Sequence, residues 1–318
     1  MSTLILSRQE VATLLNMPEV IRTVEQVFRD YAAGRAQMPA KVYLQVPKGD
    51  FRAMPAAVPN AVGVKWVNVH PDNCSRGLPT VLGIIICSDP DTAYPLAIMD
   101  ATEITAYRTA ATSANAAKYL ARPDSQTLGL IGAGRQAELH LQSHALLFDL
   151  KRVRVFDKRS ETAESFQEKF PGYPIEVTSA EQAAQSDIVC TLTPSREPVL
   201  RAEWIRPGTH INAVGADAPG KQELDPAILQ SACVVVDDLT QAYHAGEINV
   251  PLKQGLFKKE QVRAILGEII TGAKIGRQDE SETTVFDSTG LAIEDVATAW
   301  LIYQRAREQG GHLSVQIV

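Results

Sequence analysis

The chain has 318 residues, of which 45% are hydrophobic and 21% are charged. This length favours two domains, and the composition is that of an ordinary globular protein. The net charge of −6 gives no support for a nucleic-acid partner or an anionic membrane surface. The most conspicuous apolar run, residues 81–87, is far too short to span a bilayer and is typical of a buried strand.

The N-terminus and the cysteines indicate a cytoplasmic protein. Residues 1–10 lack the basic segment and the long apolar core that mark a signal peptide. Cys74, Cys87, Cys190 and Cys233 are scattered, and no two of them have CxxC spacing. We therefore expect free thiols in a reducing compartment. His70, His210 and His244 do not have the spacing of zinc ligands, so no metal site is expected.

The first third of the chain indicates two helices followed by a sheet. Ser7 and Glu10 form a capping-box pattern, which predicts a helix start. A longer amphipathic helix is expected over residues 18–33, ended by Gly34. Turn residues then separate short runs typical of strands, which predicts a mostly antiparallel or mixed sheet. These runs are residues 41–46, 51–54, 63–69, 80–88 and 96–100.

A different pattern begins after residue 100. Residues 101–121 are rich in Ala and Thr and predict a long buried helix, with a domain boundary near Pro123. Strand-like runs then alternate with helical stretches, which predicts an α/β domain with a doubly wound parallel sheet. A last helix follows Gly290, and the strand-like tail, residues 313–318, is able to return to the first domain. The alternating runs are residues 127–131, 153–157, 175–177, 188–191, 210–214, 233–236 and 284–286.

The first of these runs leads directly into a glycine motif, Gly132-x-Gly134-x-x-Ala137. In a Rossmann turn, the first glycine permits the tight turn, the second lets the backbone approach a pyrophosphate, and the small third residue allows close helix packing. Free amides at the helix N-terminus, near Arg135 and Gln136, would attract the diphosphate. The pattern predicts a dinucleotide site, although a glycine turn for another ligand stays open.

The next strand ends on an acid, Asp157, which lies 157 − 132 = 25 residues after Gly132. A carboxylate there is placed to bond the ribose hydroxyls of NAD and disfavours a 2′-phosphate. Lys158 and Arg159 follow directly, and their charges would tolerate that phosphate. We therefore predict NAD as the cofactor, with NADP as the alternative.

Four cations stand out in the first domain: Lys41, Arg52, Lys65 and Arg108. Lys65 interrupts an otherwise apolar strand, where a charge is costly unless it has an anionic partner. Arg52 interrupts its own apolar run in the same way. Taken singly, each is readily explained as a solvated charge at a sheet edge. Together they predict a site that binds a carboxylate.

A candidate proton carrier, Asp217, lies in the loop beyond the strand that ends near Gly215. Open α/β sheets bind ligands at such strand ends, and a carboxylate there is suited to general acid/base catalysis. The alternative is that Asp217 is only a turn or helix-capping residue. His70, His210 and His244 are alternative bases, although each is explained more simply as a structural residue.

The chain resembles the ornithine cyclodeaminase/mu-crystallin family over nearly its whole length, and within it the alanine dehydrogenase-like members. The segments that carry the resemblance are Lys41-Val-Tyr-Leu, Arg52-Ala-Met-Pro, Lys65-Trp-Val-Asn, Gly77-Leu-Pro-Thr80, Pro95-Leu-Ala-Ile-Met-Asp100, Arg108-Thr-Ala-Ala-Thr-Ser, His210-Ile-Asn-Ala-Val-Gly, Pro219-Gly-Lys221-Gln-Glu-Leu, Gly246-Glu-Ile and Phe286-Asp-Ser288-Thr-Gly.

The resemblance implies a homodimer whose α+β substrate-binding and dimerisation domain comprises residues 1–123 and 300–318. It implies a Rossmann NAD-binding domain over residues 124–299. Lys65 and Lys41 would contact the substrate carboxylate, and Asp217 would be the catalytic acid/base, with Lys65 also in the catalytic set. The positions that match cofactor contacts are Thr80, Arg108, Gly132, Gly134, Arg135, Gln136, Asp157, Lys158, Arg159, Thr193, Val214, Lys221 and Ser288.

One departure within the family is informative. Ornithine cyclodeaminases resemble this chain but have a glutamate at the position of Arg52, where a carboxylate suits a substrate with a distal ammonium. The leading hypothesis is therefore an NAD-dependent oxidoreductase that deaminates a small L-amino acid or reduces its imine. Arg52 and Lys65 would hold the carboxylate, and Asp217 would move the protons. The alternatives are a cyclic-imine reductase acting on pyrroline-2-carboxylate or a similar ketimine, an ornithine cyclodeaminase, and a non-catalytic mu-crystallin-like binding protein.

Overall fold

The computed structural model describes residues 2–317, with Cys74 described by its backbone alone, and it divides into two compact units. The first unit is Met1–Thr109 with Leu291–Val318, and the second is Ala110–Gly290. The limits predicted from the sequence, residues 123 and 299, lie later in the chain. The boundary near Pro123 was predicted because proline breaks helices and strands. In the structure, the first unit instead ends inside the long helix α3 (Thr102–Leu120), at Thr109.

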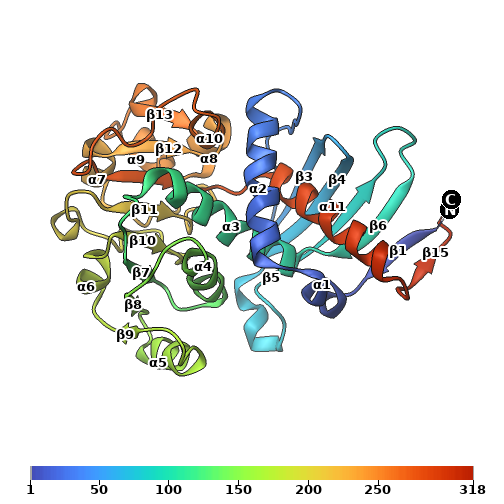
Figure 1. The fold of residues 1–318 in the computed structure, drawn as a ribbon, viewed down its shortest axis with the longest axis horizontal. Helices are drawn as coiled ribbons and strands as arrows, with labels where there is room; N and C mark the ends of the chain where they lie inside the picture. Colours follow the sequence, from blue (N-terminus) through green and yellow to red (C-terminus); the bar gives the residue numbers. More distant parts are fainter. Residues whose placement is uncertain (1, 318) are drawn as a thin grey trace. The chain divides into compact units, whose positions relative to one another are not determined.

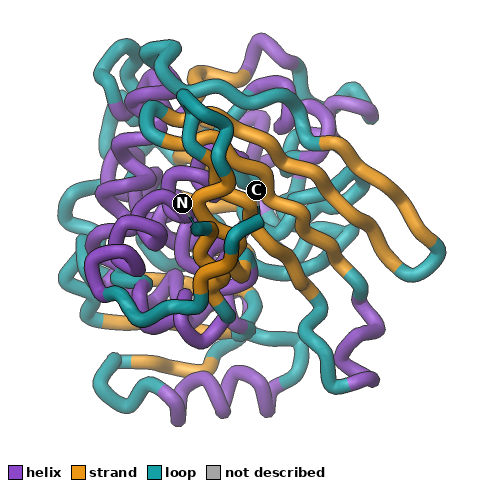
Figure 2. The backbone as a smooth tube through the Cα atoms, turned by 90° about the vertical axis from the view of Figure 1, so that its right-hand side faces the viewer, coloured by secondary structure: helices purple, strands orange, loops and turns teal. Residues whose placement is uncertain are grey.

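The first unit contains a seven-stranded mixed sheet with the order β15-β1-β6-β5-β4-β3-β2. Neighbouring strands are antiparallel except β1 and β6, and Figure 2 shows the strands side by side in a twisted sheet. The tail does return to this unit, because Val315 pairs with Thr3. The bounds are β1 (Thr3–Leu6), β2 (Val42–Val46), β3 (Gly49–Val58), β4 (Ala61–Val69), β5 (Val81–Ser88), β6 (Pro95–Asp100) and β15 (Ser314–Val315).

Helices cover one face of this sheet. Helix α11 (Ala292–Gln309) packs on strands β3, β4 and β5, and α2 (Met17–Ala32) packs on α11 (Figure 1). A Cβ at Gly63 would lie 3.1 Å from Val296, so glycine lets the helix approach the sheet closely. Helix α1 (Arg8–Leu14) starts with the predicted capping box of Ser7 and Glu10. A 3₁₀ turn, η1 (Pro71–Arg76), links β4 and β5.

The second unit is a parallel sheet of eight strands in the order β13-β12-β14-β11-β10-β7-β8-β9, as the strand–helix alternation predicts. The strand order reverses between β7 and β10. Of the strands in this sheet, β13 is the one that was not predicted from the sequence. The strands are β7 (Thr127–Ile131), β8 (Arg152–Phe156), β9 (Ile175–Val177), β10 (Ile188–Thr191), β11 (His210–Ala213), β12 (Cys233–Val236), β13 (Val262–Ile265) and β14 (Thr284–Asp287).

Short helices connect these strands. Many begin at a side-chain cap, as Ser179 does for α6 and Asp238 does for α8. They are α4 (Arg135–Ala145), α5 (Ser160–Lys169), α6 (Ala180–Ala184), α7 (Pro226–Ser231), α8 (Leu239–Ala245), α9 (Asn249–Lys253) and α10 (Leu266–Ile270), with the 3₁₀ turns η2 (Ala202–Trp204) and η3 (Lys259–Gln261). Within the described residues no helix is both long and apolar enough to cross a membrane.

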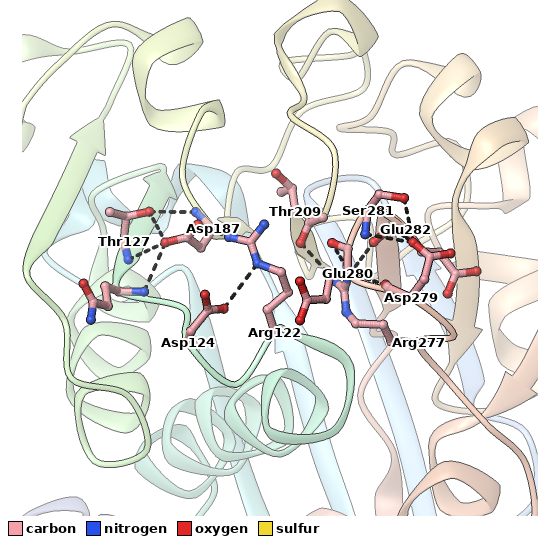
Figure 3. A network of polar contacts seen from close by, with 12 residues as sticks. Arg122, Asp124, Thr127, Asp187, Thr209, Arg277, Asp279, Glu280, Ser281 and Glu282 are labelled. Carbon is pink, nitrogen blue, oxygen red and sulfur yellow. Dashed lines mark hydrogen bonds and ion pairs between the residues drawn. The ribbon is translucent and has the colours of Figure 1, made fainter.

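A polar network fixes the amino-terminal edge of the parallel sheet (Figure 3). Arg122 donates to Asp187 at 2.6 Å, and the same carboxylate accepts the amide of Thr127 at 3.0 Å. Arg277 donates to the carbonyl oxygens of Leu120 at 2.8 Å and Gly208 at 3.1 Å. These contacts join the starts of several strands, so this edge is structural and the opposite, carboxyl edge is left for ligands.

Buried histidines and cysteines complete the interior of the chain. Burial lowers the pKa of His140 and His210 to about 3, so both are neutral. The imidazole of His210 forms a hydrogen bond with the hydroxyl of Thr284, in agreement with a structural role. Cys87, Cys190 and Cys233 are free and buried, as expected. The side chain of Cys74 lies outside the described part of the structure.

Candidate active site

The turn after β7 has the geometry that the glycine motif predicts. Gly132 has a φ of 102°, a conformation that residues other than glycine rarely adopt. A Cβ there would lie 3.0 Å from the carbonyl oxygen of Leu192, so the turn runs close to the loop after β10. Because the strand order reverses between β7 and β10, this turn lies at the topological switch point, where open α/β sheets bind ligands.

Helix α4 begins directly after this turn. Its N-cap, Gly134, has no capping side chain among the described residues, and a Cβ there would meet no atom within 4 Å. A cavity of about 370 Å³ adjoins the turn, and Arg135, Glu138 and Lys169 are among its lining residues. Free N–H groups and the helix dipole favour an anion at such a terminus. The second unit therefore has the donors and the space for a dinucleotide diphosphate.

Asp157 lies at the carboxyl end of β8, beside the glycine turn. Its two oxygens accept the amides of Ala133 and Arg159, each at 2.9 Å. A carboxylate has about four lone-pair positions, so it retains capacity for ribose hydroxyls. Lys158 and Arg159 are exposed just beyond the strand end. These residues fit the adenosine side of NAD, and the two exposed cations keep NADP as an alternative.

Asp217 lies in the loop after β11 and is paired with a lysine. The Nζ atom of Lys221 is 2.5 Å from Oδ1 of Asp217, and it also donates to the carbonyl oxygen of Gly215 at 3.4 Å. The Asp217 side chain is one-third exposed, at 33%. A cation at this distance stabilises the charged carboxylate, which is the form that accepts a proton. The resemblance assigned Lys221 to the cofactor, and the structure adds this contact with Asp217.

One buried carboxylate, Glu223, joins the loops that carry Thr193 and Val214. Glu223 accepts the amide and the hydroxyl of Thr193, both at 2.7 Å, and the amide of Gly215 at 2.7 Å. Burial raises the pKa of Glu223, and these hydrogen bonds partly offset the rise. Residue 215 has to be glycine, because a Cβ would lie 2.0 Å from the carbonyl oxygen of Thr193. The two loops are thereby held in contact.

The predicted residues of the second unit gather at one edge of its sheet. Ser288 follows β14, where its amide donates to Ala213 at 2.9 Å, and its side chain is buried. Gln136 lies in the first turn of α4. Each of the following residues comes just after the carboxyl end of a parallel strand: Gly132, Asp157, Thr193, Val214, Asp217 and Ser288.

In the first unit, Lys65 is the most deeply buried of the four predicted cations, with 1% of its surface exposed. It lies on the face of the sheet that α11 covers, between the buried side chains of Met54 and Ile85. Its ammonium is 2.7 Å from Asp295 and donates to the hydroxyl of Thr105 at 3.3 Å. An ammonium has three donors, and the third has no acceptor among the described residues. Burial lowers the pKa of Lys65 to about 7, against the opposing effect of Asp295.

Arg108 is bound to the same carboxylate. Its Nε donates to Asp295 at 2.9 Å and its Nη1 donates to Glu294 at 3.0 Å, with all three side chains buried. Burial alone would lower the pKa of Arg108, but the two carboxylates outweigh burial and raise it. The carboxylates leave Arg108 charged, and their contacts place it in the same cluster as Lys65.

The other cations of the first unit have different surroundings. Arg52 shares the helix-covered face of the sheet and is paired with Asp50 at 2.8 Å. Lys41 lies close enough for its charge to lower the pKa of Lys65 further, after the larger effect of burial. Thr80 comes immediately before β5 and is half-buried. The structure thus brings Lys65 and Arg108 together directly, with Lys41 nearby, whereas Arg52 has its own carboxylate.

Several partners in these clusters were not identified from the sequence. Glu294 and Asp295 are two adjacent acids in the mostly apolar first half of α11, which is the same signal that singled out Lys65. Glu223 belongs to the segment Pro219-Gly-Lys221-Gln-Glu-Leu, and no role was predicted for its side chain. Within the described residues no group of three or more His, Cys, Asp or Glu side chains is placed to hold a metal ion.

Comparison with known proteins places this geometry in a family. The model of the ornithine cyclodeaminase/mu-crystallin family matches residues 1–310. Alanine dehydrogenase from Archaeoglobus fulgidus is 51% identical over 308 residues, which cover 96% of each chain. The solved structure of an archaeal alanine dehydrogenase dimer with bound NAD is 49% identical, with a TM-score of 0.98 and full coverage of both chains.

A second solved structure shares the fold at lower identity. Thermococcus litoralis Δ1-pyrroline-2-carboxylate reductase, in complex with NADH and L-proline, is 39% identical with a TM-score of 0.94, and the match covers 99% of this chain and 100% of that one. The predictions of family and of an α/β fold with a parallel sheet are confirmed. The chain belongs to the ornithine cyclodeaminase/mu-crystallin family.

Proposed function

We propose that this chain is an NAD-dependent oxidoreductase that interconverts a small L-amino acid and its 2-oxo acid, as an alanine dehydrogenase does. The observation that carries the proposal is the Lys65 ammonium, a buried cation whose third N–H has no acceptor among the described residues. A buried donor left without a partner is costly, so such a group is suited to bind an anionic ligand. The 51% identity with an alanine dehydrogenase favours an amino-acid carboxylate as that ligand.

The residues of the second unit fit NAD. The uncapped start of α4 and the open space at Gly134 suit the diphosphate, and Asp157 suits the ribose hydroxyls. When bound, NAD supplies the acceptor for the hydride that leaves the α-carbon of the substrate. All other steps fall to side chains of the protein.

These side chains would bind the substrate and move its protons. Lys65, together with Arg52 and Lys41, would hold the carboxylate. Asp217 would accept a proton from the substrate ammonium and release it to solvent before the second transfer. It would then accept a proton from the water that adds to the imine carbon and pass it to the nitrogen, which leaves as ammonia while the remaining hydroxyl loses its proton to give the 2-oxo acid. Lys221, 2.5 Å from Oδ1 of Asp217, would stabilise the charged carboxylate between the two transfers.

Reduction of a cyclic imine is the second candidate, supported by the structural match to a Δ1-pyrroline-2-carboxylate reductase. It requires the same carboxylate site and one proton donor, but no water. Ornithine cyclisation is less compatible with Arg52, because a cation there repels a distal ammonium. A purely binding role would leave the paired Asp217 and Lys221 without a use.

We also propose a homodimer that forms through the open face of the seven-stranded sheet. Val62, Trp66 and Ile84 are 39%, 40% and 45% exposed on this face, and Trp66 pairs directly with Ile84. An extended apolar face of this kind is typical of an interface, and the archaeal alanine dehydrogenase is described as a dimer. Light scattering is expected to give twice the mass of 34.6 kDa. A cytoplasmic location, where thiols stay reduced, completes the proposal.

The test of function is absorbance at 340 nm. We expect NADH to form with a small L-amino acid and NAD, and NADH to be consumed with pyruvate and ammonia. Consumption only with a cyclic imine would favour the reductase, and ammonia release from ornithine without net NADH would favour the cyclodeaminase.

Substitution of Asp217 tests the proton carrier. Asp217→Asn is expected to lower kcat by about 10²-fold or more, while calorimetry shows nearly unchanged NAD binding. The control Asp149→Asn changes an exposed acid and should keep wild-type turnover. Unchanged turnover in Asp217→Asn would remove Asp217 from the mechanism.

A further inference from the structure

We propose that Asp295 is a positioning residue, which keeps the Lys65 ammonium charged and fixed with one N–H left for the carboxylate of the substrate. The proposal deepens the proposed function and rests on it, because it takes Lys65 as the group that binds the substrate carboxylate. Asp295 lies on α11.

The first argument is geometric. The two oxygens of Asp295 bind different cations, since Oδ2 lies 2.7 Å from Lys65 and Oδ1 accepts from Arg108 at 2.9 Å. Arg108 is held in turn by Glu294 at 3.0 Å. Rotation of the Asp295 carboxylate would break one of its contacts, so its position is determined from both sides. Lys65, with a flexible four-carbon stem, takes its fixed position from this anchored carboxylate and from Thr105.

The second argument concerns the charge of Lys65. Among the described residues, Asp295 is the only carboxylate in contact with Lys65. Burial between Met54 and Ile85 is the largest influence and lowers the pKa of Lys65, and the charges of Arg108 and Lys41 lower it further. Asp295 opposes all three. Without it, the pKa of Lys65 would be lower still, and more of Lys65 would be the neutral amine, which binds a carboxylate weakly.

Asp295→Asn and Glu294→Gln form a matched pair for the test. Both acids are buried, adjacent in sequence and bound to Arg108, but only Asp295 contacts Lys65. The probe is propionate, a carboxylate without an amine that would itself titrate. Its dissociation constant is measured by calorimetry from pH 5.5 to pH 9, with saturating NAD, for the wild type and both variants.

In the wild type, propionate binding should weaken as the pH rises and Lys65 loses its proton. In Asp295→Asn this midpoint should move at least one pH unit lower, so that binding at high pH is about tenfold weaker or more. Glu294→Gln should keep the wild-type midpoint. A merely structural loss would weaken binding equally at every pH and leave the midpoint in place.

The outcomes separate the two proposals. Wild-type protein that binds no propionate at any pH would overturn the proposed carboxylate site, and the role of Asp295 with it. Binding with the same midpoint in Asp295→Asn and the wild type would overturn the positioning role alone. Asp295→Ser, which is smaller and leaves room for water, gives the same comparison if Asp295→Asn does not fold.

Discussion

The two units bury charged groups in opposite ways. In the first unit, each buried cation meets a carboxylate, as Lys65 and Arg108 meet Asp295. In the second unit, buried carboxylates meet backbone amides instead. Glu223 accepts the amides of Thr193 and Gly215, and Asp287 accepts those of Glu247 at 2.8 Å and Ile248 at 3.2 Å.

The difference indicates two roles. A cation paired with a carboxylate keeps its charge, and a spare donor on that cation can bind an anionic ligand. A carboxylate that accepts hydrogen bonds from backbone amides holds the loops that carry those amides in place. We therefore interpret the first-unit cluster as the part that binds substrate, and the second-unit acids as the part that shapes the loops at the cofactor edge.

The largest expected effect comes from removing the binding cation. Lys65→Met keeps the apolar stem between Met54 and Ile85 but leaves Asp295 with one cation fewer. We expect kcat/KM for the amino acid to fall by about 10³-fold, since a lost charge-assisted contact and an uncompensated carboxylate together amount to about 4 kcal/mol. The NAD dissociation constant should stay within about twofold, as measured by calorimetry.

Lys48→Met is the control for this prediction, because Lys48 is an exposed cation of the β2–β3 turn in the same sheet. It should keep wild-type kinetics. If Lys65→Met raised the NAD dissociation constant as strongly as it lowered kcat/KM for the amino acid, the assignment of substrate binding to the first-unit cluster would be wrong.

A smaller effect is expected from separating the two loops of the second unit. A Cβ at Gly215 would lie 2.0 Å from the carbonyl oxygen of Thr193, so Gly215→Ala has to displace backbone. We expect it to lower the free energy of unfolding by about 2–4 kcal/mol, the range of an overpacked site. Urea denaturation measures this change.

Gly134→Ala is the matched variant, because a Cβ at Gly134 meets no atom within 4 Å. Its free energy of unfolding should change by less than about 1 kcal/mol, while its methyl group takes up the space proposed for the diphosphate and weakens NAD binding. Equal losses of stability in both variants would contradict the tight contact between the loops.

Local sequence signals predicted much of this architecture. The motif around Gly132 is contained within one strand, one turn and one helix, so a short stretch of sequence specifies it. Asp157 follows from the same local pattern. The predicted strands of the parallel sheet also match closely, because buried parallel strands are short apolar runs. The exception in this sheet is the four-residue strand β13, and in the mixed sheet of the first unit β1 was missed for the same reason: a pattern this short is too brief to detect.

Contacts distant in sequence could not be predicted. Arg108 and Asp295 are 187 residues apart, and no spacing rule connects a strand lysine such as Lys65 with a helix near the C-terminus. The sequence did indicate that Lys65 needs an anion, and the structure supplies the Asp295 carboxylate for one of its three N–H groups and the Thr105 hydroxyl for a second. Glu223 was missed because its partners are backbone amides, which have no sequence signature.

The last expected effect, the smallest for a change of one pH unit, is a pH dependence of stability that has opposite signs in the two units. Burial raises the pKa of Asp287 to about 7, although the amides of Glu247 and Ile248 oppose it. The folded state thus binds a proton that the unfolded state has already lost between pH 3.8 and about 7. The stabilisation is fully present below that window and is lost as the pH rises through it, by about 1.4 kcal/mol per pH unit.

The contribution of Asp295 to stability changes with pH in the opposite direction. Burial alone would raise its pKa, but Arg108 and Lys65 outweigh burial and lower it, so its contribution is present at neutral pH and is lost on acidification. Urea midpoints from pH 5 to pH 8 should therefore fall less steeply in Asp287→Asn than in the wild type, whereas Asp149→Asn, at an exposed site, should keep the wild-type slope. An unchanged slope in Asp287→Asn would mean that its carboxylate is charged in the fold, and that amide donors stabilise a buried charge as effectively as the cations of the first unit do.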